Sequence, residues 1–357
     1  MSQPAETEFS LDSSAELLAG VPASAIRGRS PWYLAWRRLR RNTLAFVALG
    51  LFVLIVAACA AAPLYAQYVA HMGPNETNVT GKVEVNGVEE DVVSVGGVIN
   101  GKLVPSIPIG PTWFSAGGRY VLGADTLGRD VAVRLLYGGR NSLLVGIGSS
   151  AICVFFAILL ALLAGYFGGW GDFVITRFFD LFYAFPVVLL GIALGSALAV
   201  NGFHWGGIDI ESGSLWIPLL VISYVLIPYI GRPLRGQVLS LREKEFVEAS
   251  ISQGARPLRI MVAELLPNIA SSVLVFFTLI IANNIVLEAA LSFLGAGVQD
   301  PTPSWGKLIA DGQDLIITRP MLALAPGIAI ILTVLSLNIF GDGLRDALDP
   351  RAKVKVH

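Results

Sequence analysis

Six long apolar segments, none of which contains a lysine or an arginine, constrain the fold of this chain more than any other feature. They lie at Thr43–Ala66, Ser142–Tyr166, Leu181–Val200, Leu215–Ile230, Ile269–Leu291 and Met321–Phe340. About 20 apolar residues cross the hydrocarbon core of a bilayer as an α-helix. Because lipid offers the backbone no hydrogen-bond partners, each segment is predicted to be helical. The sequence therefore predicts an all-α membrane protein with six transmembrane helices.

Lysines and arginines are unequally shared between the segments that connect these helices. Six precede the first helix and six lie within 232–268, whereas 201–214 has none and 292–320 has two. Because cytoplasmic loops carry the excess of basic residues, both termini are predicted to be cytoplasmic. The loop at 67–141 is then extracytoplasmic, and it is long enough to be exempt from the rule.

The connecting segments define the expected organisation of the chain. Trp32, Tyr33 and Trp36 stand beside four arginines, a pattern typical of an anchor at the membrane interface. In the outer loop, Lys82–Val95 alternates valines with polar residues around Asn86-Gly87. This pattern predicts a β-hairpin, with an irregular loop covering the outer face as the alternative. We expect a mobile cytoplasmic tail (1–30), an anchor and first helix (31–66), an extracytoplasmic loop (67–141), a core of helices two to six (142–343) and a cytoplasmic tail (344–357).

The sequence offers no set of residues for catalysis or metal binding. A phosphate-cradling loop needs Ser or Thr after its Gly-Lys pair, but the three Gly-Lys pairs are followed by Val83, Leu103 and Leu308. The two cysteines, Cys59 and Cys153, lie in apolar segments and cannot build a disulfide framework or a metal site. We expect no catalytic residue, no metal and no cofactor in this chain. A net charge of −1 also gives no indication of nucleic-acid binding.

The cytoplasmic segment at 232–268 is the most informative stretch outside the membrane. Glu243–Gln253 is predicted to be a short helix with Phe246, Ala249 and Ser250 on one face. Gly254 follows where the helix would end, Pro257 where a second would begin, and Pro267 is expected to break the chain before the fifth transmembrane helix. Such a helical pair suits docking of another protein. The alternative is a surface loop that only carries positive charge.

The run from Glu248 to Gly254, followed by Leu265-Leu266-Pro267-Asn268, resembles the EAA loop of permeases in binding-protein-dependent ABC importers. In that family the loop carries a coupling helix that fits a groove on the ATPase subunit. Ser250 stands where the family has a second alanine, and Ala263-Glu264 where it often has Arg-His. The resemblance implies an ATPase-coupling role for Phe246, Val247, Glu248, Ala249, Ser250, Gly254, Ala255, Pro257 and Pro267.

The resemblance extends from about residue 32 to 352 and narrows to one subfamily. Leu122–Asp130 with Arg134–Gly138 is similar to the entry to the second helix in C-type permeases of dipeptide and oligopeptide (peptide/nickel) importers. The segments Leu291–Gly295, Pro303–Gly306 and Gly341–Pro350 match the same subfamily in order. The residues of the motif before the second helix are Gly123, Asp125, Gly128, Arg129, Asp130 and Arg134.

This resemblance implies a multi-pass permease subunit of the bacterial inner membrane. Its partners would be a homologous B-type permease, two ATPase subunits that hold ATP and Mg, an extracytoplasmic substrate-binding protein and membrane lipid. Peptides are the expected cargo, with nickel, glutathione or oligosaccharides as alternatives. From the residues alone, a gradient-driven secondary transporter and a non-transporting sensor or assembly factor remain open. A secondary transporter usually shows internal repeats, which this sequence lacks.

Polar residues inside the predicted helices are candidates for a functional site. Asn283, Asn284 and Glu288 lie on the fifth helix and could line a translocation path or bond neighbouring helices. Pairs of small residues, Gly146 with Ser150 and Gly191 with Gly195, predict faces where helices pack closely.

Overall fold

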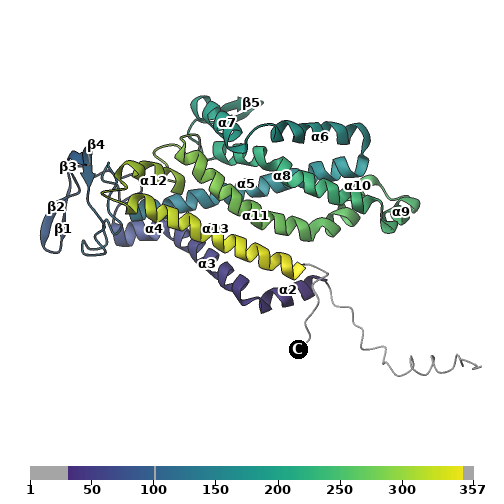
Figure 1. Ribbon diagram of the computed structural model, residues 1–357, viewed down its shortest axis with the longest axis horizontal. Coiled ribbons are helices and arrows are strands. Elements are labelled where there is room, and N and C mark those ends of the chain that lie inside the picture. The colour runs from purple at the N-terminus through teal and green to yellow at the C-terminus, as the bar shows by residue number, and fades with distance from the viewer. Residues whose placement is uncertain (1–30, 100–101, 349–357) are drawn as a thin grey trace, which may run out of the picture.

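Long helices make up most of the computed structural model, which describes residues 31–99 and 102–348 (Figure 1). The predicted tail at 1–30 and the last residues of the predicted tail at 344–357 lie outside this range. Within it, five helical stretches could cross a membrane: α3 (Thr43–Ala60), α5 (Val131–Phe167), α8 (Trp216–Arg242), a stretch at Pro257–Phe293 and α13 (Met321–Leu348). The stretch at Pro257–Phe293 consists of α10 (Pro257–Arg259), a π-helical turn (Ile260–Leu265) and α11 (Leu266–Phe293).

The third predicted transmembrane helix, Leu181–Val200, is not one straight helix. The chain forms α6 (Gly169–Tyr183) and α7 (Val187–Asn201), which meet at an angle of 90°. Pro186 precedes α7 and has no N–H to donate, and a residue before proline is disfavoured in helical conformation. The described residues therefore contain five candidate membrane helices, or six if this bent pair is one transmembrane segment.

Several helices begin or end well outside the apolar segments. Where the prediction began the second helix at Ser142, α5 begins at Val131, about three turns earlier. Likewise α8 continues past Ile230 to Arg242, and α13 continues past residue 344 to Leu348. The first part of the segment at 232–268, up to Arg242, is therefore helical and belongs to α8. These extensions carry polar side chains, so apolar composition could not reveal them.

Two helices, α2 (Pro31–Arg41) and α3, form the N-terminal end of the described chain. The basic helix α2 ends before Asn42, whose side-chain oxygen accepts a hydrogen bond of 3.1 Å from Ala45 N–H and caps α3. After α3, where an unbroken run to Ala66 was predicted, the chain forms α4 (Ala62–Tyr65) and a π-helical turn (Ala66–Ala70).

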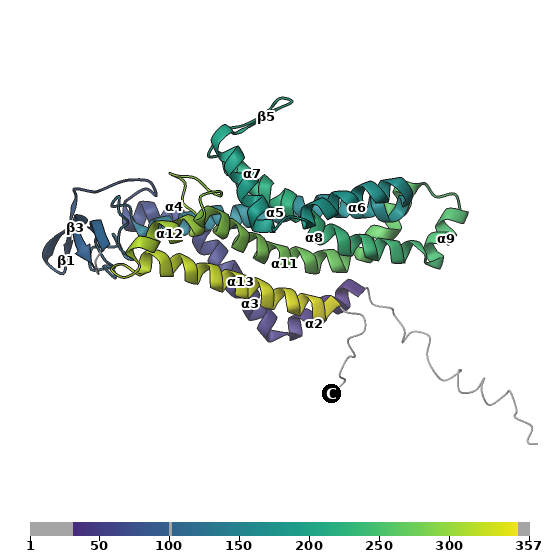
Figure 2. The ribbon, with the colours of Figure 1, turned by 45° about the horizontal axis from the view of Figure 1, so that its top comes forward.

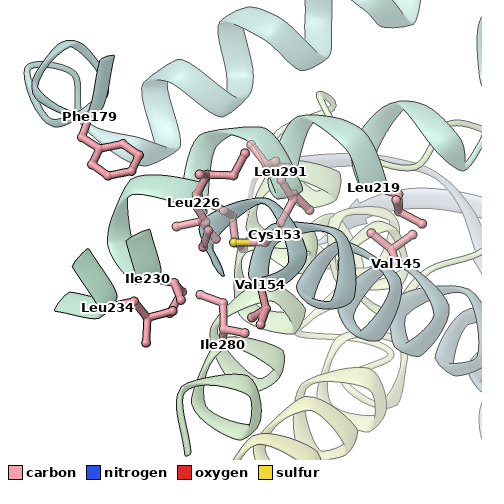
Figure 3. Close-up of a cluster of buried hydrophobic side chains, with 14 of the residues drawn as sticks. Val145, Cys153, Val154, Phe179, Leu219, Leu226, Ile230, Leu234, Ile280 and Leu291 are labelled. Atoms are coloured by element: carbon pink, nitrogen blue, oxygen red, sulfur yellow. The ribbon is translucent and has the colours of Figure 1, made fainter. Parts of the chain in front are cut away.

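The helices pack around α5, which contacts α3, α8 and α11. Figure 3 shows part of this core, in which Val145, Cys153 and Val154 of α5 meet side chains of α8 and α11. A Cβ atom on Gly146 would lie 2.4 Å from Ile285 of α11, and one on Gly191 would lie 3.1 Å from Leu291 of the same helix. A Cβ on Gly195 would lie 2.3 Å from the carbonyl oxygen of Ala296, in the turn after α11. Both predicted small-residue faces are thus confirmed as close contacts, the usual means of packing helices in lipid.

Short strands gather mainly at one end of the molecule. Strands β1 (Lys82–Val85) and β2 (Val88–Asp91) pair antiparallel around Asn86-Gly87, both at positive φ as a tight hairpin requires. A second antiparallel pair consists of β3 (Val93–Ile99) and β4 (Lys102–Pro108), and a third of β5 (Phe203–Trp205) and β6 (Ile208–Ile210). The pairs β1–β4 lie at the opposite end of the long axis from α9 (Glu245–Ser252) (Figure 2).

Candidate functional site

The short helix α9 projects from the end of the bundle beyond α6 and α11 (Figure 1). Within α9 only Val247 is buried, and it packs in a cluster with Leu162 of α5, Val238 of α8 and Ile260 of the π-helical turn. The side chains of Glu248, Ala249 and Ile251 are exposed, as is 36% of Phe246. One side chain therefore attaches α9 to three long helical stretches, while the rest of its surface is available to a partner.

The end of α9 is shaped by Gly254. The Gly254 N–H donates to the Ile251 carbonyl at 2.9 Å, and the Ala255 N–H donates to the Ser250 carbonyl at 3.1 Å. Gly254 has φ +78°, and a Cβ there would meet no atom within 4 Å. Glycine is thus required at this helix end for its backbone conformation, as in left-handed C-caps, and not for lack of space.

The remaining predicted coupling residues continue from this turn. Ala255 is half-buried and Pro257 opens α10 with its ring exposed. Pro267 does not break the chain as predicted, because it lies in the first turn of α11 and the π-helical turn before it continues the helix. It stands about 15 Å along the helix from Pro257, so it is not part of the α9 surface.

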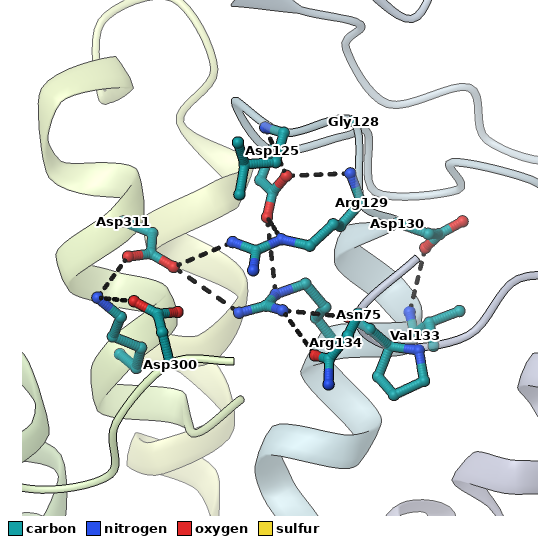
Figure 4. Close-up of polar contacts among 12 residues, drawn as sticks. Asn75, Asp125, Gly128, Arg129, Asp130, Val133, Arg134, Asp300 and Asp311 are labelled. Atoms are coloured by element: carbon teal, nitrogen blue, oxygen red, sulfur yellow. Dashed lines mark hydrogen bonds and ion pairs between the residues drawn. The ribbon is translucent and has the colours of Figure 1, made fainter. Parts of the chain in front are cut away.

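The motif before α5, from Gly123 to Arg134, forms a buried network of charges (Figure 4). The Asp125 carboxylate accepts hydrogen bonds from the Arg129 backbone N–H at 3.0 Å and from Arg129 Nε at 2.6 Å. Arg134, on the first turn of α5, is fully buried, with Nε 3.7 Å from Asp125 Oδ2 and Nη2 3.8 Å from Asp311 Oδ2. Its Nη1 donates to the Pro74 carbonyl at 3.1 Å. Arg134 therefore joins three segments that are distant in sequence.

Three further members of this network were missed by the sequence analysis. Helix α12 (Trp305–Gly312) carries Lys307 and Asp311, whose charged groups are 3.1 Å apart, and Lys307 lies 3.0 Å from Asp300. Burial lowers the pKa of Lys307, but the carboxylates of Asp300 and Asp311 outweigh burial and raise the pKa above its ordinary value. The spacing of Lys307 and Asp311 is the i,i+4 pattern of a helical ion pair, which was the available signal.

Asp130 positions the start of α5. Its Oδ1 accepts hydrogen bonds from the N–H groups of Ala132 at 2.8 Å and Val133 at 3.1 Å, and its Oδ2 accepts one from Tyr120 at 2.6 Å. Burial raises the pKa of Asp130, and the N–H groups of Val133, Tyr120 and Ala132 act in the opposite direction. The carboxyl thus caps the helix and holds the preceding loop against it.

Gly123 and Gly128 allow this loop to fold closely on itself. Gly123 has φ +92° and a Cβ there would lie 2.8 Å from the Ile109 carbonyl oxygen. Gly128 has φ +71°, and its Cβ would lie 2.4 Å from the Asn78 carbonyl oxygen. The six residues of the motif therefore act together to dock the loop that precedes α5 on α5 and α12: Gly123, Asp125, Gly128, Arg129, Asp130 and Arg134.

Gly128→Ala is expected to destabilise the protein by about 2 kcal/mol or more, because it adds a backbone clash to the cost of a left-handed residue. Gly117→Ala is the matched control: Gly117 has φ +64°, but no atom lies within 4 Å of its Cβ position. It should cost only the conformational term, about 1–2 kcal/mol. Unfolding midpoints of the two purified variants in mild detergent provide the comparison, and equal midpoints would contradict the close approach.

The three polar residues of α11 do not share one environment. Asn284 is buried, and its amide oxygen accepts hydrogen bonds from the hydroxyls of Ser149 and Ser150 at 2.8 and 2.9 Å. Glu288 is also fully buried, and its Oε1 accepts a hydrogen bond of 2.7 Å from Ser292. Asn283, by contrast, is exposed on another face of α11. The structure therefore separates Asn283 from the two residues that face the packed interior.

Ion pairs attach α6 to the part of α8 that leads to α9. Arg235 pairs with Asp172 and Arg232 pairs with Asp180, and the Arg232 guanidinium lies 4.1 Å from the centre of the Tyr183 ring. From the sequence, Arg232 and Arg235 were predicted only to be among the six basic residues of the segment at 232–268. Their partners on α6 could not be identified because the fold of α6 against α8 was unknown.

Five or six helices of the described chain are long and apolar enough to cross a membrane, so the fold defines a multi-pass membrane protein. The profile of the binding-protein-dependent transport system inner membrane component matches residues 157–354. The profile of the N-terminal transmembrane domain of oligopeptide transport permease C matches residues 30–80. The chain belongs to the binding-protein-dependent transport system inner membrane components, and within them it is a C-type permease.

Relatives of known name agree with this assignment. The dipeptide transport system permease protein DppC of Alkalihalophilus pseudofirmus is 36% identical over 324 residues, covering 91% of each chain. The glutathione transport system permease protein GsiD of Pectobacterium atrosepticum is 36% identical over 338 residues, covering 94% of this chain and 97% of that protein. The solved inward-facing MetNI methionine ABC transporter aligns with 60% of this chain and 96% of its own, at 16% identity and a TM-score of 0.48. The protein is a multi-pass protein of the bacterial inner membrane.

Proposed function

We propose that this chain forms, together with a homologous B-type permease subunit, the membrane path of an ATP-driven importer for peptides. The two relatives of known cargo carry dipeptides and glutathione, which is itself a short peptide. The shared chemistry of these cargoes supports peptides over nickel or oligosaccharides. Glutathione remains the second candidate cargo because a relative of equal identity carries it.

The proposed orientation places α9 on the cytoplasmic side and strands β1–β4 outside. Support comes from the basic residues on α2 and around α9, and from the position of the strands at the opposite end (Figure 2). An extracytoplasmic substrate-binding protein would meet the outer loop, and two ATPase subunits on the cytoplasmic side would bind ATP with Mg and hydrolyse the ATP. The chain itself would be no enzyme.

The exposure of α9 is the observation that carries the proposed coupling role. A partner that grips the exposed face of α9 moves Val247, and Val247 packs against α5, α8 and the π-helical turn before α11. A displacement of α9 is therefore passed to three membrane segments at once. The ATPase would shift the permease between two states by contacting α9 differently in each, as any coupled equilibrium requires.

The polar residues of α11 are proposed to divide into two roles. Asn284 holds α11 to α5, because its amide oxygen accepts hydrogen bonds from Ser149 and Ser150 of that helix. Glu288 accepts a hydrogen bond from Ser292 one turn further along α11, inside the packed interior. Asn283 is the candidate for contact with the path or with the second permease subunit, because it is a polar side chain exposed on a membrane-crossing helix.

Affinity purification of the tagged chain from its native membrane tests the proposal. We expect a second permease subunit and one or two ATPases to accompany the wild-type chain. Glu248→Ala should weaken ATPase retention about tenfold or more, the usual effect of truncating an interface hot spot. Gly254→Val should act similarly, because valine disfavours the left-handed conformation at the end of α9. In both variants, ATP hydrolysis should lose its coupling to peptide uptake.

Glu90→Ala is the matched control, since Glu90 is an exposed glutamate on β2 at the other end of the molecule. This variant should retain the ATPases as the wild-type chain does. Normal uptake by both α9 variants would remove the coupling role. If the chain purifies alone and transports peptides in liposomes without ATP, the protein is a gradient-driven carrier and the importer proposal is wrong.

A further inference from the structure

A hydrophobic groove of about 470 Å³ lies between the N-terminal helices and the C-terminal helix. Its walls come from α2, α3, α11 and α13, and in Figure 2 α2 and α3 lie beside α13. The lining is dominated by large apolar side chains, among them Trp36, Leu39, Phe52, Leu274, Phe277 and Phe340. We call this feature the α2 groove.

Positive charge is concentrated where α2 borders the groove. Helix α2 contains four arginines and no acidic residue. Arg37, Arg40 and Arg41 are exposed, and the Arg40 guanidinium lies 4.9 Å from the centre of the Trp36 ring. Trp36 therefore contacts both the apolar groove and a cation. The nearby end of α13 adds exposed Asp342, Arg345 and Asp346, so the two helix ends together remain positive.

We infer that the α2 groove, with Arg37, Arg40 and Arg41, is a binding site for one anionic phospholipid. An acyl chain fits the apolar lining, and the phosphate group fits the guanidinium groups, which form charge-assisted hydrogen bonds with phosphate oxygens. Basic residues beside a membrane helix attract anionic lipids in this way. The occupant is a lipid and not a partner helix because charge complementarity at the mouth calls for a negative headgroup. The leaflet, though not the site, depends on the orientation proposed above.

Native mass spectrometry of the purified chain in neutral detergent, titrated with phosphatidylglycerol or phosphatidylcholine, tests this site. The wild-type protein should bind phosphatidylglycerol more tightly than phosphatidylcholine. The triple variant Arg37→Gln, Arg40→Gln, Arg41→Gln should lose affinity for phosphatidylglycerol by about fivefold per arginine, on the order of a hundredfold in total. The control triple variant, Arg242→Gln, Arg256→Gln, Arg259→Gln, removes equal charge from exposed residues elsewhere and should bind as wild type does.

A second variant keeps the test independent of charge. Leu274→Trp narrows the groove and should weaken the binding of both phosphatidylglycerol and phosphatidylcholine. The unfolding midpoint of this variant shows whether it is folded. Equal wild-type affinity for the two lipids, or an equal loss of affinity in the control triple variant, would overturn the inference.

In the intact membrane complex, Leu49→benzoylphenylalanine places a photoreactive group in the groove and should cross-link to phospholipid. Cross-linking to a partner subunit would show that a protein fills the groove instead.

Discussion

Replacing Arg134 by methionine is expected to lower the free energy of unfolding by about 3 kcal/mol. Breaking a buried ion pair from one side typically costs about 3–5 kcal/mol, because the partner charge stays buried and uncompensated. The lower end applies here since Asp125 keeps Arg129 at 2.6 Å and Asp311 keeps Lys307 at 3.1 Å. Reversible unfolding of the purified variant in mixed detergent micelles measures the loss.

The same helix provides a matched control for this variant. Arg140→Met removes an arginine from an exposed position on α5 and should change stability by less than about 0.5 kcal/mol. Combining Arg134→Met with Asp125→Asn should cost less than the sum of the two single changes, because the residues share one network. A strictly additive result would mean that Arg134 and Asp125 do not interact energetically.

Val247→Asp is expected to abolish ATP-driven uptake while most of the bundle stays folded. An unpaired carboxylate in an apolar cluster costs several kcal/mol, more than one helix attached by a single side chain can offset. We therefore expect α9 to leave its site, so that force on α9 no longer reaches α5 and α8. Hydrogen exchange should show lost protection at 245–252 with α8 unaffected.

Val262→Asp is the control for this change, since Val262 lies on the neighbouring π-helical turn with 53% of its surface exposed. It should leave both uptake and the protection of α9 close to wild type. Retained uptake by Val247→Asp, with α9 still protected, would show that Val247 does not transmit the motion.

The apolar segments predicted the number and location of most membrane helices, and the structure shows where such reasoning ends. Hydropathy located α3, α5, α8, α11 and α13 because lipid imposes apolar composition on each. It did not reveal the 90° bend between α6 and α7, since a proline is tolerated in many straight membrane helices. Hydropathy also predicted α5 and α8 to be shorter than they are, because their polar ends pair with other segments instead of facing lipid.

For the candidate sites, local patterns were sufficient and long-range partners were not. The α9 segment was predictable because its helix, its Gly254 turn and the resemblance to the EAA loop all lie within a few residues. The burial of Val247 against α5 was not, since Leu162 and Val247 are far apart in sequence. Asn283 and Asn284 are neighbours in sequence and were treated alike, yet the helical period places one of them inside and the other outside.

By itself the sequence determined that this protein crosses the membrane repeatedly and belongs to the C-type permeases, because both depend on composition and on contiguous motifs. Only the tertiary structure decided that Arg134 meets Asp311, that Arg235 meets Asp172, and that α2 forms a groove with α13. Those contacts join residues many positions apart, and helix packing brings them together. Local periodicity indicates which face of a helix is apolar, but it does not specify which other helix will cover that face.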